Sequence, residues 1–125
     1  MPENSTPQSS NDYMLDLTGN AELFADMNAG KMEYHTDDMN WYRVTPQGPE
    51  RMTHAEAVTA AQDAMSKRLA DYVTSITQAP ADPLARKRTQ RTIDILGRAV
   101  TAQGAKEVLD AARRNPKLAK NRGKS

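Results

Sequence analysis

The chain has 125 residues, of which 38% are hydrophobic, contains no cysteine, and carries a formal net charge of +1 at pH 7. This length predicts one domain with a modest core, because small domains bury a smaller fraction of their surface. Without cysteine, disulfides and thiolate metal sites are excluded. No apolar run approaches the roughly 20 residues of a membrane span, and no signal-peptide pattern is present, so we expect a cytoplasmic protein.

The small net charge hides a strong division along the chain. Residues 1–79 carry five Lys or Arg against twelve Asp or Glu, whereas residues 80–125 carry twelve Lys or Arg against four Asp or Glu. The two parts therefore differ in sign, at −7 and +8. This division suits an anionic partner for the basic part, or self-association in which opposite parts meet.

The N-terminal region predicts a tail followed by a short helix. Residues 1–15 open with a polar stretch rich in Ser, Pro, Asn and Gln and are predicted to be disordered. The helix is expected to begin with Thr18 or Asn20 as its cap and to end at Gly30. Its apolar side consists of Leu23, Phe24 and Met27.

Between residues 31 and 44 apolar and polar side chains alternate, which predicts a β-hairpin with a turn rich in Asp and Asn. Tyr34, Trp41 and Tyr42 could form a stacking platform for unpaired bases, but such residues more often cover a small core. A core position is favoured most for Trp41, and the alternation places Tyr42 on the opposite face. Pro46, Gly48 and Pro49 are expected to interrupt regular structure after the hairpin.

Three further helices are predicted. Thr53 and Glu56 match a capping box, and the long helix after it has one apolar stripe and closes at residues 79–81. Asp82 and Pro83 begin the next helix, and the last covers about residues 103–114. The expected buried positions of the three helices are Val58, Ala61, Met65, Leu69, Tyr72 and Ile76, then Leu84, Ile93, Leu96 and Val100, then Val108, Leu109 and Ala112.

These elements predict an α+β fold that is mostly α, with a short helix and a β-hairpin packed on a three-helix bundle. The domain is expected to span residues 16–116. Residues 117–125 contain four Lys or Arg in nine positions and are predicted to be a disordered basic tail.

The basic residues of the second part are the most informative functional feature. A surface of Lys and Arg binds nucleic acid by neutralising phosphates, with little dependence on base sequence. The predicted phosphate contacts are Arg86, Lys87, Arg88 and Arg91, with Arg113 and Arg114 as second choices and Tyr42 as a stacking residue. The alternative is that these side chains only form an ordinary solvated helix face. The argument against it is that the charges of this part of the chain are predominantly positive.

Catalytic chemistry is not expected. His35, Asp37, Asp38 and His54 could hold a metal ion in principle, but no spacing forces them to converge, and a solvated turn explains them more simply. No nucleophile stands beside a candidate base. We therefore expect no enzyme activity, no cofactor and no metal.

The order of motifs resembles the N-terminal accessory domain of phage and plasmid primase-helicases related to the poxvirus replication helicase. The likeness is carried by residues 18–25 (TGNAELFA), 32–34 (MEY) and 41–42 (WY), and by the Ala- and Leu-rich segment 105–112. It spans about residues 17–116. Leu23 stands where that group often has Arg, the second strand lacks a further Trp, and the ATPase motor is not part of this chain.

The resemblance implies a non-catalytic accessory module of DNA replication that binds DNA or a replicative helicase or primase subunit. It does not transfer ATP hydrolysis or primer synthesis. The alternative from another class is a protein-binding adaptor or small inhibitor that docks on a host or phage protein through its oppositely charged parts. An enzyme using the His and Asp residues near the hairpin remains a third alternative, and it would require a bound metal.

Overall fold

A computed structural model describes residues 13–76 and 82–121, and it contains four helices and one small sheet. The chain is therefore α+β and mostly α, as the sequence predicts. The elements in chain order are α1 (Leu17–Asn28), β1 (Met32–His35), β2 (Asn40–Thr45), β3 (Gly48–Arg51), α2 (His54–Ser75), α3 (Pro83–Val100), α4 (Ala102–Ala112) and β4 (Ala119–Lys120).

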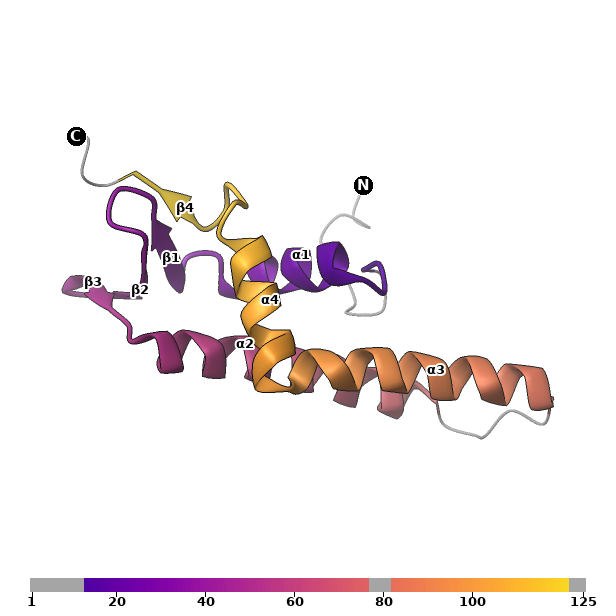
Figure 1. Ribbon diagram of the computed structural model, residues 1–125. Coiled ribbons are helices and arrows are strands. Elements are labelled where there is room, and N and C mark those ends of the chain that lie inside the picture. Colours follow the sequence, from indigo (N-terminus) through magenta and orange to yellow (C-terminus); the bar gives the residue numbers. More distant parts are fainter. Residues whose placement is uncertain (1–12, 77–81, 122–125) are drawn as a thin grey trace, which may run out of the picture.

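The sheet has the strand order β3-β2-β1-β4 and is built around the predicted hairpin. Strands β1 and β2 pair antiparallel with Tyr34 opposite Trp41, and β3 continues antiparallel along β2. Strand β4 pairs parallel with β1 at Tyr34 and His35. The C-terminal strand β4 thus joins a sheet that is otherwise built from residues 32–51, and this sheet lies at one end of the molecule (Figure 1).

The predicted break after the hairpin is confirmed at Pro46, which lies in a turn, and is wrong for Gly48 and Pro49, because residues 48–51 form β3. Pro49 lies opposite Val44 on an edge strand, where a residue without an N–H is tolerated if that position faces away from the partner strand. The Met52 N–H donates to the Trp41 carbonyl, and alternation along β3 then directs the Pro49 nitrogen outward. Gly48 has a φ of 111°, a conformation that glycine adopts without strain.

The C-terminal segment is also more ordered than predicted. Leu118 is fully buried in the core, and Ala119 and Lys120 form β4, so the expectation of a tail from residue 117 onward is wrong for these residues. Leu118 contributes one apolar side chain within a basic stretch, too short a signal for periodicity to detect. Residues 122–125 lie outside the described part.

Aromatic side chains join α1 to the sheet. Phe24 is fully buried, and its ring meets Trp41 edge-on with centroids 6.0 Å apart. Tyr34 meets the same indole at 5.1 Å. The core placement of Trp41 and Tyr34 is confirmed, and edge-to-face contacts of this kind stabilise beyond the area they bury.

The segment before α1 is fixed by a buried arginine. Arg68 of α2 is 1% exposed, and its guanidinium donates to the Asn20 side chain at 2.5 Å and to the carbonyls of Tyr13 and Met14 at 2.7 and 2.9 Å. Residues 13–15 therefore have fixed backbone positions, which corrects that part of the predicted disordered tail. Residues 1–12 lie outside the described part.

Asp16, and not Thr18 or Asn20, caps α1. The Asp16 carboxylate accepts from the Gly19 N–H at 2.8 Å. Gly19 lies directly beneath the Met14 backbone, where a Cβ would come within 1.9 Å of the Met14 carbonyl oxygen. The predicted caps fail because Asn20 points inward to Arg68, so its side chain is not available to the helix end.

The capping box of α2 is confirmed, because the Thr53 hydroxyl accepts from the Glu56 N–H while the Glu56 carboxylate accepts from the Thr53 N–H. Of the predicted stripe, Ala61 and Met65 are buried and the others are half-buried. The predicted closure of this helix at residues 79–81 lies outside the described part.

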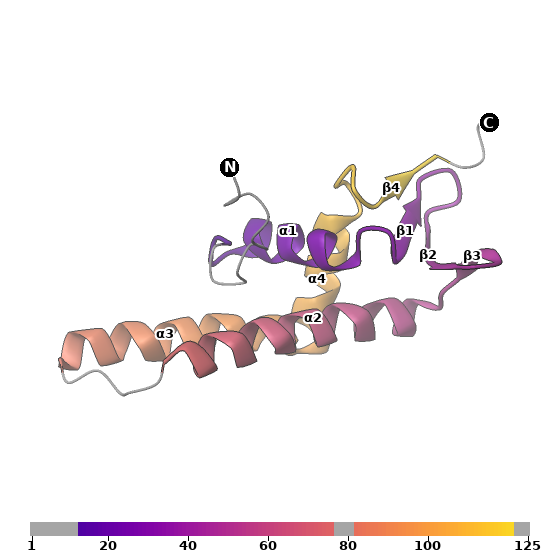
Figure 2. The ribbon, with the colours of Figure 1, turned by 180° about the vertical axis from the view of Figure 1, so that it is seen from behind.

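Helices α2 and α3 run side by side, and the first half of α3 projects beyond α1 and α4 (Figures 1 and 2). Only α2 is available there to cover α3, so few side chains of this part are buried. Leu84 is 55% exposed, which corrects its predicted core position, whereas Leu96 is buried as predicted. Ile93 and Val100 are half-buried.

Helix α4 begins at a Thr101 cap and buries Val108, Leu109 and Ala112, as predicted. Gly104 permits the sharp junction with α3, since a Cβ there would lie 2.1 Å from the Arg98 carbonyl oxygen. From this junction α4 leads away from α3 toward the sheet (Figure 1).

Candidate nucleic-acid interface

Helix α3 has a buried side and a basic side. Asp82 caps the helix through its carboxylate, which accepts from the Leu84 N–H, and Pro83 occupies the first helical position. The side toward α2 carries small and apolar residues at alternating spacings of four and three, a pattern that keeps one side of a helix in contact with its neighbour. These residues are Ala85, Thr89, Thr92, Leu96 and Ala99.

Four exposed cations lie on the opposite side, and we call Lys87, Arg88, Arg91 and Arg98 the basic face of α3. Two shallow hollows follow this side of the helix, and Lys87 and Arg91 line both of them. Gln90, Asp94, Ile95 and Arg98 complete one hollow, and Arg88 with the exposed Leu84 completes the other. Cations therefore predominate in both hollows, beside one carboxylate and two apolar side chains.

Arg86 stands apart from this face although it is contiguous with it in sequence. At about 100° of rotation per residue, Arg86 lies about 140° around the helix from Arg91, whereas Arg88 lies only about 60° from it. Arg86 lines neither hollow. Arg98 belongs to the basic face although it is distant in sequence. Residues 87, 91, 94 and 98 follow one another by about one helical turn, so they lie on the same side of α3. Sequence reasoning selected the contiguous run and so missed Arg98.

The charge of the basic face is not neutralised locally. In residues 13–76 and 82–121, no carboxylate lies within ion-pairing distance of its four cations. Asp94 is the one acidic residue of α3, and its carboxylate accepts from Gln90 at 2.9 Å. Asp94 lies on the same side of the helix as Lys87, Arg91 and Arg98 and lines one of the hollows with them, so four cations against one carboxylate leave this side with a net positive charge that attracts anions.

The position of these cations is unfavourable for the helix itself. Lys87 and Arg88 lie near the N-terminal end of α3, where the helix dipole favours negative charge, and the first turn contains no acidic residue. Lys87 and Arg91 also repel each other at a spacing of four. Each effect costs a few tenths of a kcal/mol, so the basic face does not serve the stability of the helix.

The other predicted contacts lie elsewhere. Arg113 caps the C-terminal end of α4, with Arg114 next to it, beside the sheet and away from the first half of α3 (Figure 2). Tyr42 lies on β2, at the other end of α2 from the start of α3. The 22 residues of α2 span about 33 Å at 1.5 Å per residue. The structure therefore brings together three of the seven predicted residues.

Tyr42 is also occupied by local contacts. Its ring stacks on the His35 imidazole with centroids 3.8 Å apart, and its hydroxyl donates to the Asp38 carboxylate at 2.5 Å. This hydrogen bond raises the pKa of the Tyr42 phenol and lowers the pKa of the Asp38 carboxyl. One face of the ring is covered, so a base could stack only on the other face.

A separate groove of about 580 Å³ lies between the end of α1, strand β2 and the start of α2. Its lining combines cations, carboxylates and apolar side chains, including Lys31, Arg43, Glu56, Asp63, Met32 and Met52. A groove of mixed charge and apolar floor is suited to a peptide more than to a polyanion.

Within the described ranges, no helix has the length and apolar character required to cross a membrane. Comparison of the chain with protein-family models, with curated proteins and with solved structures gives no match.

Proposed function

We propose that this chain is a non-catalytic accessory module of DNA replication, of the phage or mobile-element type, which binds DNA through the basic face of α3. Binding is largely independent of base sequence, because phosphate contacts carry no direct base information. The module acts in the cytoplasm, or in that of the host if a phage encodes it. A replicative helicase or primase subunit is the protein partner that the resemblance implies.

One observation carries this proposal: four exposed cations lie along α3, and within the described part none of them has a carboxylate at ion-pairing distance. A polyanion supplies the missing compensation, since each phosphate contact releases condensed counterions.

The motif behind the family resemblance has a structural explanation in this chain. Gly19 admits the Met14 backbone, and Asn20 accepts from the buried Arg68. These contacts give the string Gly19-Asn20 a structural role in this chain, and the string says nothing of nucleic acid by itself. The function rests on the basic face.

The test is a titration of fluorescently labelled DNA at low salt, read by anisotropy. We expect the triple variant Lys87→Gln, Arg88→Gln, Arg91→Gln to bind at least about tenfold more weakly than the unmodified chain. The control Lys31→Gln, Lys67→Gln, Lys106→Gln removes the same charge from exposed positions outside the basic face. It should bind nearly as well as the unmodified chain.

Single variants refine the test. Arg91→Gln should weaken binding more than Arg86→Gln, because Arg91 lies in the basic face and Arg86 does not. No DNA binding by the unmodified chain, or equal loss in the two triple variants, would refute the proposal. An equal loss of DNA affinity in the two triple variants would indicate that binding depends on the net charge of the chain and not on an interface at α3.

The adaptor alternative is supported by the groove between β2 and α2, whose mixed lining suits a peptide. Its test is capture of a protein partner that survives nuclease treatment. Met52→Lys in the groove floor should abolish that capture, whereas the α3 triple variant should not. Met52 is buried, so Thr59→Arg at the groove wall provides a second, exposed variant.

A further inference from the structure

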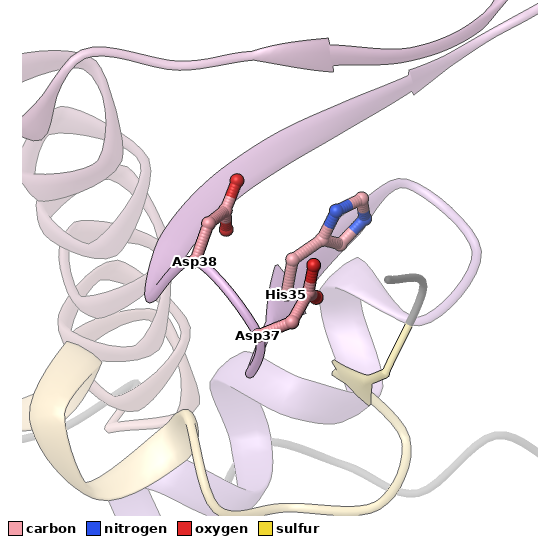
Figure 3. A group of neighbouring side chains, drawn as sticks. All are labelled: His35, Asp37 and Asp38. Carbon is pink, nitrogen blue, oxygen red and sulfur yellow. The ribbon is translucent and has the colours of Figure 1, made fainter. Parts of the chain in front are cut away.

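The turn between β1 and β2 gathers three potential metal ligands. His35, Asp37 and Asp38 each offer one donor atom, and these three atoms lie within 4.8 Å of one another (Figure 3). The second histidine of the chain, His54, is not a member of this group. The sequence predicts no metal site, because the spacing of these residues does not require their side chains to meet. In the structure the tight turn after β1 brings them together.

His35 is held as a metal-binding imidazole usually is. Only 6% of the residue is exposed, and its Nε2 lies 2.9 Å from the buried Glu33 carboxylate. Because a carboxylate only accepts hydrogen bonds, this contact keeps the proton on Nε2 and leaves the lone pair on Nδ1. A carboxylate behind a histidine in this manner orients the ring and makes it a better ligand.

The second ring nitrogen has no hydrogen-bond partner among the described residues, although the side chain is more than nine-tenths buried. The Tyr42 ring, stacked at an interplanar angle of 16°, prevents the imidazole from turning toward solvent. A buried imidazole with one committed and one vacant nitrogen beside two carboxylates has the donor arrangement of a cation ligand.

The two carboxylates differ in mobility. Asp38 is fixed, because it accepts from the Tyr42 hydroxyl and from the Asn40 N–H at 3.2 Å, and these bonds keep its pKa below the ordinary value. Asp37 is exposed, and its carboxylate forms no hydrogen bond or ion pair within residues 13–76 and 82–121. Ligands of one tetrahedral ion lie about 3.4 Å apart, so a small rotation of Asp37 closes the site.

We propose that His35, Asp37 and Asp38 bind one divalent transition-metal ion such as Zn²⁺, with water completing the coordination. One imidazole and two carboxylates favour zinc or a similar borderline ion over Mg²⁺, which prefers oxygen ligands alone. The site is independent of the basic face of α3. Bound metal ties the end of β1 to the turn and stabilises the sheet in proportion to metal occupancy.

The test is calorimetric titration of the untagged full chain with Zn²⁺ in a buffer that does not bind metal. We expect saturation at one equivalent, and a rise of the melting temperature with added Zn²⁺. Asp37→Asn should weaken binding at least about tenfold. Since the exposed Asp37 carboxylate forms no hydrogen bond or ion pair in the described part, this variant should keep the fold, which circular dichroism verifies.

His35→Gln gives a second variant that removes the imidazole, and it should weaken binding by a similar factor. The controls His54→Gln and Asp110→Asn remove the other histidine and an exposed carboxylate of α4. They should bind Zn²⁺ like the unmodified chain. Unsaturable binding, unchanged affinity in Asp37→Asn, or equally tight binding of Mg²⁺ would overturn the proposal.

Discussion

Replacing Arg68 by Met should be the most destabilising single change near the N-terminus. Met fills a similar length without donors, so the Asn20 side chain and the carbonyls of Tyr13 and Met14 lose the three hydrogen bonds that Arg68 gives them. The packing of the aliphatic stem is largely kept. The effect therefore isolates the polar contacts from the volume of the side chain.

The magnitude follows from the unpaired groups that remain. Leaving a buried acceptor unsatisfied costs about 1–3 kcal/mol, and removing one partner of a buried charged network costs about 3–5 kcal/mol. Burial of the Arg68 side chain, which is 1% exposed, also lowers the pKa of its guanidinium. We expect a loss of about 4 kcal/mol, a large part of the 5–15 kcal/mol typical of a domain.

The measurement is chemical denaturation with the free energy of unfolding extrapolated to water. Lys67→Met is the matched control, because Lys67 is exposed on the same helix and forms only an ion pair with Asp71 at 3.7 Å. That change should cost about 0.5 kcal/mol or less. A loss below about 1 kcal/mol for Arg68→Met would refute the assignment of Arg68 as the anchor of the N-terminal segment.

Three further outcomes are expected. Gly19→Ala should destabilise by about 2 kcal/mol or more in the same denaturation assay, because its methyl group would overlap the Met14 carbonyl. Leu118→Ala should cost about 2–5 kcal/mol of unfolding free energy, whereas a residue of a disordered tail would cost nothing. Burial and a hydrogen bond to Asp26 raise the pKa of the Tyr13 phenol to about 12, above its ordinary value of 10.0. A raised pKa in the folded state stabilises below pH 10 and is lost as pH rises toward 12. Melting temperature against pH should therefore fall over this window, and Tyr13→Phe should remove most of that fall.

Much of the fold could be predicted from local signals. The Thr53 capping box, the Asp82-Pro83 start and the alternation around Trp41 each depend on a few neighbouring residues, and the structure confirms all three. Local rules failed where a distant residue decides the outcome. Asn20 is a good helix cap by composition, but Arg68, 48 positions away, engages its side chain.

The same limit applies to the sheet. Strand β4 has two residues and is fixed by pairing with β1, more than 80 positions earlier, so no local pattern marks it. Leu84 shows the opposite error, since its apolar side chain suggested burial while the fold offers no neighbour to cover that side of α3. In the candidate interface, the basic run was visible in the sequence. The rotation of the helix, and not contiguity in the sequence, determines which cations share one side of α3.

The salt dependence of DNA binding tests the central claim most directly. The logarithm of the binding constant falls with the logarithm of salt concentration in proportion to the phosphates neutralised, with about 0.9 in slope per contact on duplex DNA and about 0.7 on single strands. Removing Lys87, Arg88 and Arg91 should therefore flatten the slope by about 2 to 3, while the control variant of Lys31, Lys67 and Lys106 keeps the original slope. Equal slopes for the unmodified chain and the α3 variant would contradict the account.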